Sequence, residues 1–461
     1  METSLPDARS RAELLVADIG STLTKVSAFF GVERGANVRF LGQAAAATTV
    51  AEGDVGVGLD RAIAGFDDEG IDVRGAPLLA CASAAGGLRM TVHGLTTDMT
   101  LRAAREASLG AGARVVLATA GALDADDLAA IARQRPSVIL LAGGVDGGER
   151  DQVIANARAL ASLGAFAPVV FAGNRAVRGT VEKIFAESGV NLIVTENVYP
   201  SLDRLEMGPA RRAIQDLFAR HVILAPGMDA VRARLGGDLV PTPAAVLAAT
   251  ELLAAVLGDL VVVDVGGATT DVCSVIDDAP RPPGVVAAAP EPRAKRTVEG
   301  DLGVFVSAAG TVAAAPAERF ELTALAALPT TPIERVLAKR LTRIAVDEAL
   351  WRHAGERRTE WGARGAVEVI EGRDLSSARW LVGTGGALTR LDGGAETLAA
   401  FRRDPRGRKR LPPEDVRVAI DRHYVMAAAG VMATHHPEAA RALVLESLGV
   451  SAAVASGARD G

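Results

Sequence analysis

Three glycine-rich turns, each beside a run of apolar residues, constrain the fold of this chain more than any other feature. They read Asp18-Ile19-Gly20-Ser21-Thr22-Leu23-Thr24-Lys25, Asp264-Val265-Gly266-Gly267-Ala268-Thr269-Thr270-Asp271 and Gly383-Thr384-Gly385-Gly386. The runs 14–17 and 260–263 lead into the first two turns, so each turn should be the tip of a buried hairpin whose aspartate ends a strand. Glycine lets backbone N–H groups approach a phosphate, Ser and Thr hydroxyls add donors, and aspartate offers a hard oxygen to hydrated magnesium. We therefore expect two hairpins that face one another across a cleft.

The composition indicates a globular protein of more than one domain and argues against several classes of partner. The chain has 461 residues, of which 49% are apolar and 23% charged, enough for two or more packed cores. A net charge of -6 and an aromatic content of 3% give no reason to expect nucleic-acid binding. The most apolar stretch, 243–265, is interrupted by acidic residues, so no membrane span is expected. Cys81 and Cys273 are too few for a disulfide framework, which fits a reducing cytoplasm.

Residues 114–200 have a repeating pattern that the rest of the chain lacks. Apolar runs alternate with helical patterns, the runs lying at 115–117, 138–141, 169–171 and 192–194. This alternation is typical of a parallel, Rossmann-like α/β unit, whose ligand-facing loops lie at the carboxyl ends of the strands. Three glycine-rich or polar loops follow these strands, at 143–148, 173–175 and 195–197. They either form a site or are ordinary strand turns.

Two helices near the later turns consist almost wholly of small residues. One is expected over about 242–255 and the other over 423–434. Small side chains let two helices cross with their backbones close together. The pattern therefore predicts either a hinge between two lobes or tight packing within one core.

The three turns and the two small-residue helices, in this order, resemble the superfamily of actin, sugar kinases and heat-shock chaperone ATPases. The resemblance implies an α/β, two-lobed actin-like (ribonuclease H-like) ATPase fold, here with an inserted Rossmann-like α/β unit. It also implies the boundaries, which are a disordered tail at 1–13, a first lobe with the first hairpin at 14–113, the insert at 114–200, a helical return at 201–255, a second lobe with the other two motifs at 256–424, and a C-terminal connecting helix at 425–461.

The same resemblance implies a site for ATP or ADP with Mg²⁺. Asp18 and Asp264 would hold the magnesium through water, and Lys25 fits either a charge near the phosphates or a solvent-facing strand lysine. The phosphates would be bound by Gly20, Ser21, Thr22, Gly266, Gly267, Thr269 and Thr270, and the adenosine would be bordered by Gly383, Thr384, Gly385 and Gly386. The candidate catalytic residues are Asp18, Asp264 and Asp271, of which Asp264 and Asp271 are the candidates for a general base.

A narrower resemblance, to the MutL (GlmL) family, covers most of the chain. It is carried by the runs 17–22 (Ala-Asp-Ile-Gly-Ser-Thr), 81–88 (Cys-Ala-Ser-Ala-Ala-Gly-Gly-Leu), 141–148 (Leu-Ala-Gly-Gly-Val-Asp-Gly-Gly), 195–200 (Thr-Glu-Asn-Val-Tyr-Pro) and 298–303 (Val-Glu-Gly-Asp-Leu-Gly). Members of this family are described as accessory proteins of glutamate mutase and related adenosylcobalamin enzymes. The resemblance implies a weak ATPase that acts as a reactivating chaperone, binding a mutase that carries damaged cobalamin so that intact cofactor can enter. A homodimer is an open alternative to a monomer.

Three other functions stay open on the sequence. A small-molecule kinase of the same fold would need an acid near an acceptor hydroxyl, and the scarcity of aromatic and His residues near the motifs argues against it. An activator of acyl-CoA dehydratases shares the Asp-Ile-Gly-Ser-Thr opening, but it bridges an iron–sulfur cluster with paired cysteines, whereas Cys81 and Cys273 lie far apart in sequence. A non-enzymatic actin-like scaffold would bind ATP without turnover.

Overall fold

The computed structural model describes residues 11–20, 22–83, 88–202, 204–221, 226–277, 283–317, 320, 322–362 and 365–451, with only the backbone described at 51, 218–221 and 362. Most of the predicted tail, Ser21 and residues 452–461 therefore lie outside the described residues. Two compact units make up the chain. The first comprises residues 1–84, 225–288 and 296–461, and the second comprises 85–224 and 289–295. The predicted insert at 114–200 falls within the second unit.

The first sheet of the first unit contains the first glycine turn. Its strand order is β10-β4-β1-β2-β3, formed by β10 (Val240–Pro241), β4 (Leu78–Ala82), β1 (Leu14–Ile19), β2 (Leu23–Phe30) and β3 (Arg39–Ala47). β1 and β2 are antiparallel and place Asp18 opposite Lys25, while β4 runs parallel to β1. The predicted hairpin is thus confirmed. The helix α1 (Val55–Asp68) packs on β2 and β3.

The second sheet of the first unit contains the other two glycine turns. Its order is β14-β12-β11-β17-β18, formed by β14 (Ala294–Glu299), β12 (Thr270–Val275), β11 (Leu260–Val265), β17 (Trp380–Thr384) and β18 (Arg417–Ile420). β11 and β12 form the second predicted hairpin, with Asp264 opposite Asp271, and β17 runs parallel to β11. Val261, Val263 and Val265 of β11 share a core with the long helix α10 (Pro332–His353). Both sheets therefore place a hairpin beside a parallel strand.

The two small-residue helices are present and cross closely. They are α8 (Thr242–Leu257) and α13 (Met426–Met432), and α14 (Pro437–Leu448) packs beside both. A Cβ atom built at Gly430 would overlap the carbonyl oxygen of Ala245, so only glycine permits this approach of the two backbones. Shorter helices of the unit are α7 (Met228–Arg232), α9 (Ala308–Ala313), α11 (Gly386–Thr389) and α12 (Gly394–Ala399).

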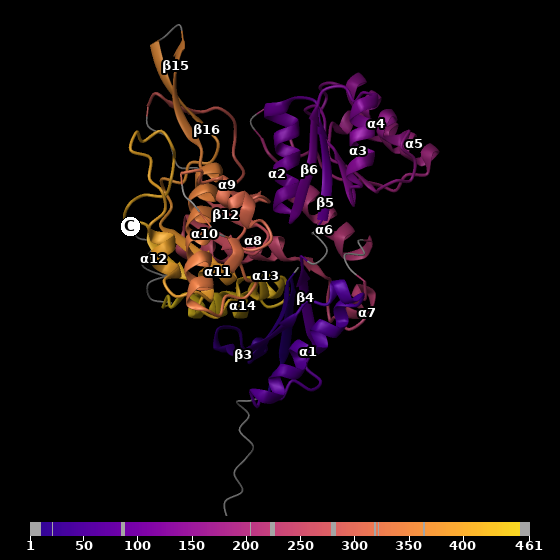
Figure 1. The fold of residues 1–461 in the computed structure, drawn as a ribbon. Coiled ribbons are helices and arrows are strands. Elements are labelled where there is room, and N and C mark those ends of the chain that lie inside the picture. The colour runs from indigo at the N-terminus through magenta and orange to yellow at the C-terminus, as the bar shows by residue number, and fades with distance from the viewer. Residues whose placement is uncertain are drawn as a thin grey trace, which may run out of the picture. The chain divides into compact units, whose positions relative to one another are not determined.

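A third, smaller sheet of the first unit has the order β13-β16-β15. β15 (Glu356–Gly362) and β16 (Gly365–Glu371) form a hairpin that extends beyond the other labelled elements of this unit, and β13 (Val285–Ala287) pairs with β16 (Figure 1). Trp361 near its end is 83% exposed.

The second unit is built on an entirely parallel sheet. Its order is β6-β5-β7-β8-β9, formed by β6 (Ala113–Ala120), β5 (Leu88–Gly94), β7 (Val138–Leu141), β8 (Val169–Phe171) and β9 (Leu192–Val194). One face is covered by α3 (Ala125–Gln134), α4 (Asp151–Ala161) and α5 (Arg178–Ser188), and α2 (Arg102–Gly110) lies on the other (Figure 1). The π-helical turn 97–101 leads into α2, and α6 (Gly208–His221) ends the unit. The predicted alternation of strands and helices is confirmed.

One strand of this sheet differs from the expectation. Residues 88–94 form β5, an interior strand of the second unit, whereas the boundaries implied by the resemblance place them in the first lobe. Arg89, Thr91 and His93 alternate with the apolar residues of β5 and interrupt the continuous run by which its neighbours are recognised. Burial of His93 is possible because the Thr119 and Thr91 hydroxyls bond its two ring nitrogens, at 2.8 and 3.0 Å.

Among the described residues, no helix has the length and apolar character needed to cross a membrane.

Candidate functional site

The first two glycine turns share one backbone geometry. The N–H of Gly20 donates to the carbonyl of Leu23 and the N–H of Gly266 donates to the carbonyl of Thr269, each at 2.9 Å. A Cβ atom at Gly20 would lie 2.7 Å from the Leu23 carbonyl oxygen, so this tight turn requires glycine. Thr22, like Gly266, Gly267 and Thr269, is half-buried at the end of its hairpin. The residues predicted to bind phosphate therefore occupy equivalent places in two sheets.

Asp18 lies at the centre of a cluster in the first sheet. Its carboxylate is 2.8 Å from the Lys25 ammonium, accepts from the Thr242 hydroxyl at 2.9 Å, and lies 3.5 Å from the Cys81 sulfur. Lys25 is only 8% exposed, so it is a buried partner of Asp18 rather than a solvent-facing strand lysine. Thr242 is the first residue of α8, which ties that helix to the first turn.

Tyr424 covers Lys25. The Lys25 ammonium lies 3.3 Å from the centre of the Tyr424 ring, a cation–π contact. Burial alone would lower the pKa of Lys25, but the Asp18 carboxylate and Tyr424 outweigh it and hold the pKa well above its usual value. Tyr424 has a φ of 53°, which a non-glycine residue rarely adopts and which surrounding contacts must maintain.

Asp421 supplies one such contact, because its backbone carbonyl accepts from the N–H of Tyr424 at 2.9 Å. The fully buried carboxylate of Asp421 accepts from the backbone N–H groups of Val425 and Met426, at 3.0 and 2.9 Å, where α13 begins. It also accepts from the Thr384 hydroxyl at 2.9 Å and the Ser447 hydroxyl at 2.5 Å. The third glycine turn is thereby connected, through Asp421 and its loop, to the tyrosine that covers Lys25.

Asp264 has a different environment from Asp18. It faces Asp271 across the hairpin, and a Cβ atom at Gly385 would overlap its Oδ1 atom. Burial and the nearby Asp271 carboxylate raise the pKa of Asp264 to about 7. Asp271 is held instead by Arg296, whose Nε and Nη2 atoms lie 3.0 and 2.6 Å from one carboxylate oxygen.

A loop after β14 holds the second turn in place. The N–H groups of Val304 and Phe305 donate to the carbonyls of Gly266 and Gly267, at 3.1 and 2.9 Å, and the Ser307 hydroxyl donates to the carbonyl of Ala268 at 2.6 Å. A Cβ atom at Gly303 would lie 2.6 Å from the Gly267 carbonyl oxygen. A side chain at Gly303, the last residue of the run 298–303, would therefore collide with the second turn.

The third turn completes the cluster. Gly383 and Thr384 end β17, beside Asp264 of β11, and Gly385 has a φ of 86° that favours glycine. Gly386 has open space where a Cβ atom would lie. The charges of Asp18, Lys25 and Asp421 all act on Asp264, so the structure gathers the residues of all three turns into one electrostatic cluster.

Four residues of the cluster were not predicted from the sequence: Thr242, Arg296, Asp421 and Tyr424. Asp421 carried a signal, because an acidic residue just before an Ala- and Gly-rich helix is a candidate cap. Tyr424 is one of only two tyrosines in the chain, but nothing in its neighbours indicates a lysine partner. Roles for Arg296 and Thr242 could not be predicted, because their partners Asp271 and Asp18 lie on other elements.

The donor set fits a hydrated cation. Within the described residues, no group of three or more His, Cys, Asp or Glu side chains is placed to hold a metal ion directly. Asp18, beside the Thr242 hydroxyl, and Asp264 offer carboxylate oxygen atoms of the kind that suits magnesium-bound water. Burial raises the pKa of the Cys81 and Cys273 thiols, which therefore stay protonated and are poor ligands for a metal cluster.

The glycine-rich loops of the second unit are organised by asparagines. The fully buried Asn174 accepts from the N–H groups of Gly147 and Ala176, each at 2.9 Å, and donates to the carbonyls of Gly148 and Glu149, at 3.3 and 2.9 Å. Its amide is thus used entirely to hold the loops.

Asn197 does the same on the next strand. It donates to the Gly144 carbonyl and the Asp146 carboxylate and accepts from the N–H of Tyr199, each at 3.0 Å. These contacts favour ordinary turn structure, one of the two alternatives that the sequence left open.

Three comparisons bear on the identity of the chain. The model of a family described as MutL protein matches residues 14–448. A protein from Clostridium tetanomorphum, Protein MutL, is 37% identical over 452 residues, which cover 92% of this chain and 97% of that protein. A nucleotide-free structure of acetone carboxylase, whose title refers to ATP-dependent acetone carboxylation, has a TM-score of 0.42 and 13% identity, over 92% of this chain and 70% of that one, too weak a likeness to support any conclusion. The family match and the curated relative together show that this chain belongs to the MutL family.

Proposed function

We propose that the protein is an ATP-binding, weakly ATP-hydrolysing chaperone that reactivates an adenosylcobalamin-dependent mutase of the glutamate mutase type. The nucleotide part rests on one observation, the gathering of three glycine turns with Asp18, Lys25 and Asp264 in one cluster. The two hairpin-bearing sheets would be the two lobes of an actin-like fold. The mutase part rests on membership of the MutL family.

The residues of the cluster have distinct tasks in this proposal. The backbone of the first two turns would bind the phosphates, and Gly383, Gly385 and Gly386 would border the adenosine. Asp18 and Asp264 would hold water molecules of the magnesium ion, which when bound neutralises phosphate charge. Lys25 already carries its positive charge at this place, so it would share that charge between Asp18 and a phosphate.

Of the two candidate general bases, Asp264 is favoured. Asp271 is already engaged, because the Nε and Nη2 atoms of Arg296 both bond to one oxygen of its carboxylate. Asp264 carries no such arginine in the contacts described, and its pKa of about 7 suits proton transfer near neutral pH. We therefore assign Asp271 to organising the second hairpin.

A retention experiment tests which protein is the client. The tagged protein, loaded with Mg-ATP or with Mg-ADP, is incubated with cell extract, and retained proteins are identified by mass spectrometry. We expect a cobalamin-dependent mutase subunit to be retained more strongly with one nucleotide than with the other. If no such enzyme is retained with either nucleotide, the chaperone function is contradicted. In a separate assay with saturating ATP, phosphorylation of an added polyol or acid would favour a kinase instead.

The second unit is proposed as the part that docks the client. Two large apolar side chains on it are exposed, Phe166 at 41% and Leu202 at 63%. Replacing both by Asp should reduce mutase retention while ATP binding stays normal. The matched control is Trp361→Ser in the first unit, and an equal loss of retention there would contradict a specific role for the second unit.

A further inference from the structure

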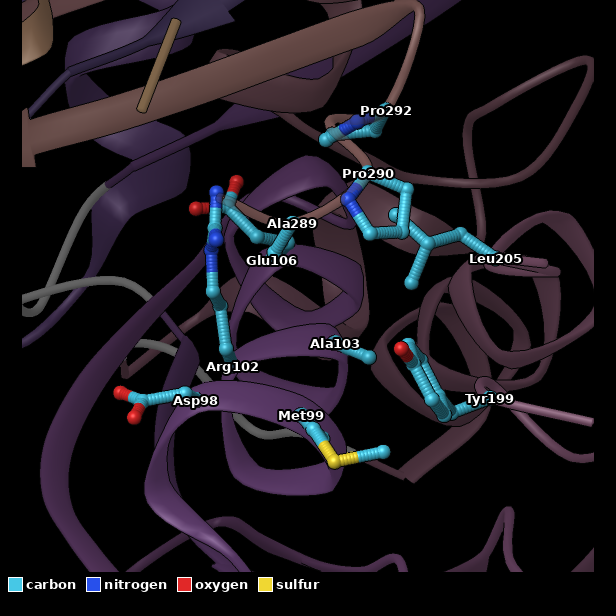
Figure 2. Close-up of a pocket in the computed structure, with 10 residues that line it drawn as sticks. All are labelled: Asp98, Met99, Arg102, Ala103, Glu106, Tyr199, Leu205, Ala289, Pro290 and Pro292. Atoms are coloured by element: carbon cyan, nitrogen blue, oxygen red, sulfur yellow. The ribbon is translucent and has the colours of Figure 1, made fainter. Parts of the chain in front are cut away.

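The second unit includes a short segment from much later in the chain. Residues 289–295, called the strap here, belong to this unit although the rest of it ends at 224. The strap lies against α2 and the segment around Tyr199 (Figure 2). Between them is a small, partly open pocket where Pro290 stands opposite Ala103. All residues that line it are in the second unit.

Buried ion pairs fasten the strap. Lys295 lies 3.0 Å from Glu291 of the strap and 3.4 Å from Glu106 of α2, and it is only 7% exposed. Glu291 also pairs with Arg102 of α2. The Arg211 guanidinium donates to the carbonyl of Ala294 at 2.7 Å. Removing one partner of a buried ion pair is costly, so these contacts form a firm anchor.

Arg296, the residue that follows Lys295, bonds within the first unit. Arg296 is 2% exposed and bonds the Asp271 carboxylate opposite Asp264. Lys295 and Arg296 are neighbours in β14, and neighbouring strand residues point to opposite faces. Their Cα atoms are held about 3.8 Å apart by the trans peptide. One peptide therefore joins a buried cation of the candidate nucleotide site to a buried cation of the second unit.

We infer that β14 couples the nucleotide site to the second unit, with Arg296 as the positioning residue at one end and Lys295 at the other. This coupling rests on the proposed function, because it takes the nucleotide to be the ligand whose charge changes beside Asp264 and Asp271. A change in the Asp271–Arg296 pair displaces Arg296, and the displacement passes through the peptide to Lys295 and the strap. The second unit thus responds to nucleotide state through the chain of β14.

Hydrogen exchange of the full-length protein tests the coupling. Amide exchange in the strap and α2 is measured with no nucleotide, with Mg-ADP and with Mg-ATP, and nucleotide binding is measured in the same samples by calorimetry. We expect exchange in the strap and α2 to change by at least about threefold between nucleotide states. Lys295→Met should keep nucleotide binding and lose that response, whereas Lys295→Arg should retain it.

A matched control is Arg352→Gln. Arg352 pairs with Glu299, at the other end of β14, and with Asp301, without touching either anchor. This variant should keep the response of α2. Nucleotide binding without any exchange change in the wild-type strap and α2 overturns the coupling and leaves the proposed function standing, even if Lys295→Met fails to fold. Absence of nucleotide binding overturns both.

Discussion

The glycine turns of the first unit and the glycine loops of the second unit look alike in sequence and differ in what surrounds them. In the first unit, Asp18, Lys25 and Asp264 gather where the turns meet. In the second unit, Asn174 and Asn197 direct their amides to the backbone of the loops themselves. Glycine after a strand therefore marks a tight turn in both places. What distinguishes the candidate site is that charged side chains, Asp18, Lys25 and Asp264, gather beside its turns.

The largest expected effect is on Asp264. Asp264→Asn should lower Mg-dependent ATP turnover by about 100-fold or more, because a neutral amide holds magnesium-bound water poorly and cannot accept a proton as a carboxylate does. The free energy of unfolding should change by less than about 1 kcal/mol, since the substitution also removes a charge facing Asp271. Turnover is measured by phosphate release and stability by urea unfolding.

The matched control lies in a glycine loop of the second unit. Asp146 accepts from Asn197 and from the N–H of Arg175, each at 3.0 Å. Asp146→Asn should leave turnover within about twofold of wild type and reduce the stability of the loop. Normal turnover in Asp264→Asn would mean that the second hairpin is misassigned.

A second test concerns the buried pair of the first hairpin. Lys25→Met should lower the free energy of unfolding by about 3 kcal/mol, because Asp18 is left without its counter-charge. The double variant Lys25→Met with Asp18→Asn should recover much of that loss. The free energies of unfolding of the single and double variants are measured by urea unfolding. If both variants lose the same free energy of unfolding, Lys25 stabilises the fold by packing alone.

The strands and turns could be predicted from the sequence because each depends on local pattern. Continuous apolar runs such as 260–263 lead through an aspartate into a glycine turn, and both hairpins could be predicted from that local pattern. The partners of the site could not be predicted in the same way. Tyr424 lies over Lys25 with an unusual φ, and its N–H donates to the carbonyl of Asp421. The Asp421 carboxylate in turn bonds to Thr384 and Ser447 from other elements. Side chains that meet through three separate segments leave no period or spacing in the sequence.

The β5 strand shows the converse limit. Its polar residues, Thr91 and His93, are fully buried, so hydrophobic periodicity gave no sign of an interior strand. Their hydroxyl and imidazole groups bond to one another and to Thr119 on the next strand. Burial of polar side chains depends on partners that sequence pattern does not reveal.

The third test targets the loops of the second unit. Asn174→Ala should lower the free energy of unfolding by about 2 kcal/mol, because two N–H groups and two carbonyls lose their partner in a buried place. ATP turnover should be unaffected if these loops are structural. The control is Asn191→Ala, at an exposed position. Lost turnover with unchanged stability in Asn174→Ala would instead make these loops part of a site.

The smallest expected effect is a pH dependence from the second unit. Burial lowers the pKa of His93 from 6.5 to about 4. Above pH 6.5 the imidazole is neutral in both the folded and the unfolded chain and has no effect on stability. As the pH falls through 6.5, the unfolded chain binds a proton that the folded chain does not bind until the pH is about 4, so the free energy of unfolding decreases over this window.

By about pH 5.5 this linkage should cost the second unit about 1 kcal/mol relative to neutral pH, and His93→Gln should remove that part of the slope. Gln is a suitable replacement because it cannot titrate but can still bond the Thr91 and Thr119 hydroxyls. Urea unfolding of both proteins across the window measures the difference between their slopes. Because the cause is burial without a charged partner, the slope should be insensitive to nucleotide, unlike any effect at Asp264. If the free energy of unfolding of the variant falls with pH as steeply as that of the wild type, the pH dependence comes from other groups. The lowered pKa of His93 would then be contradicted.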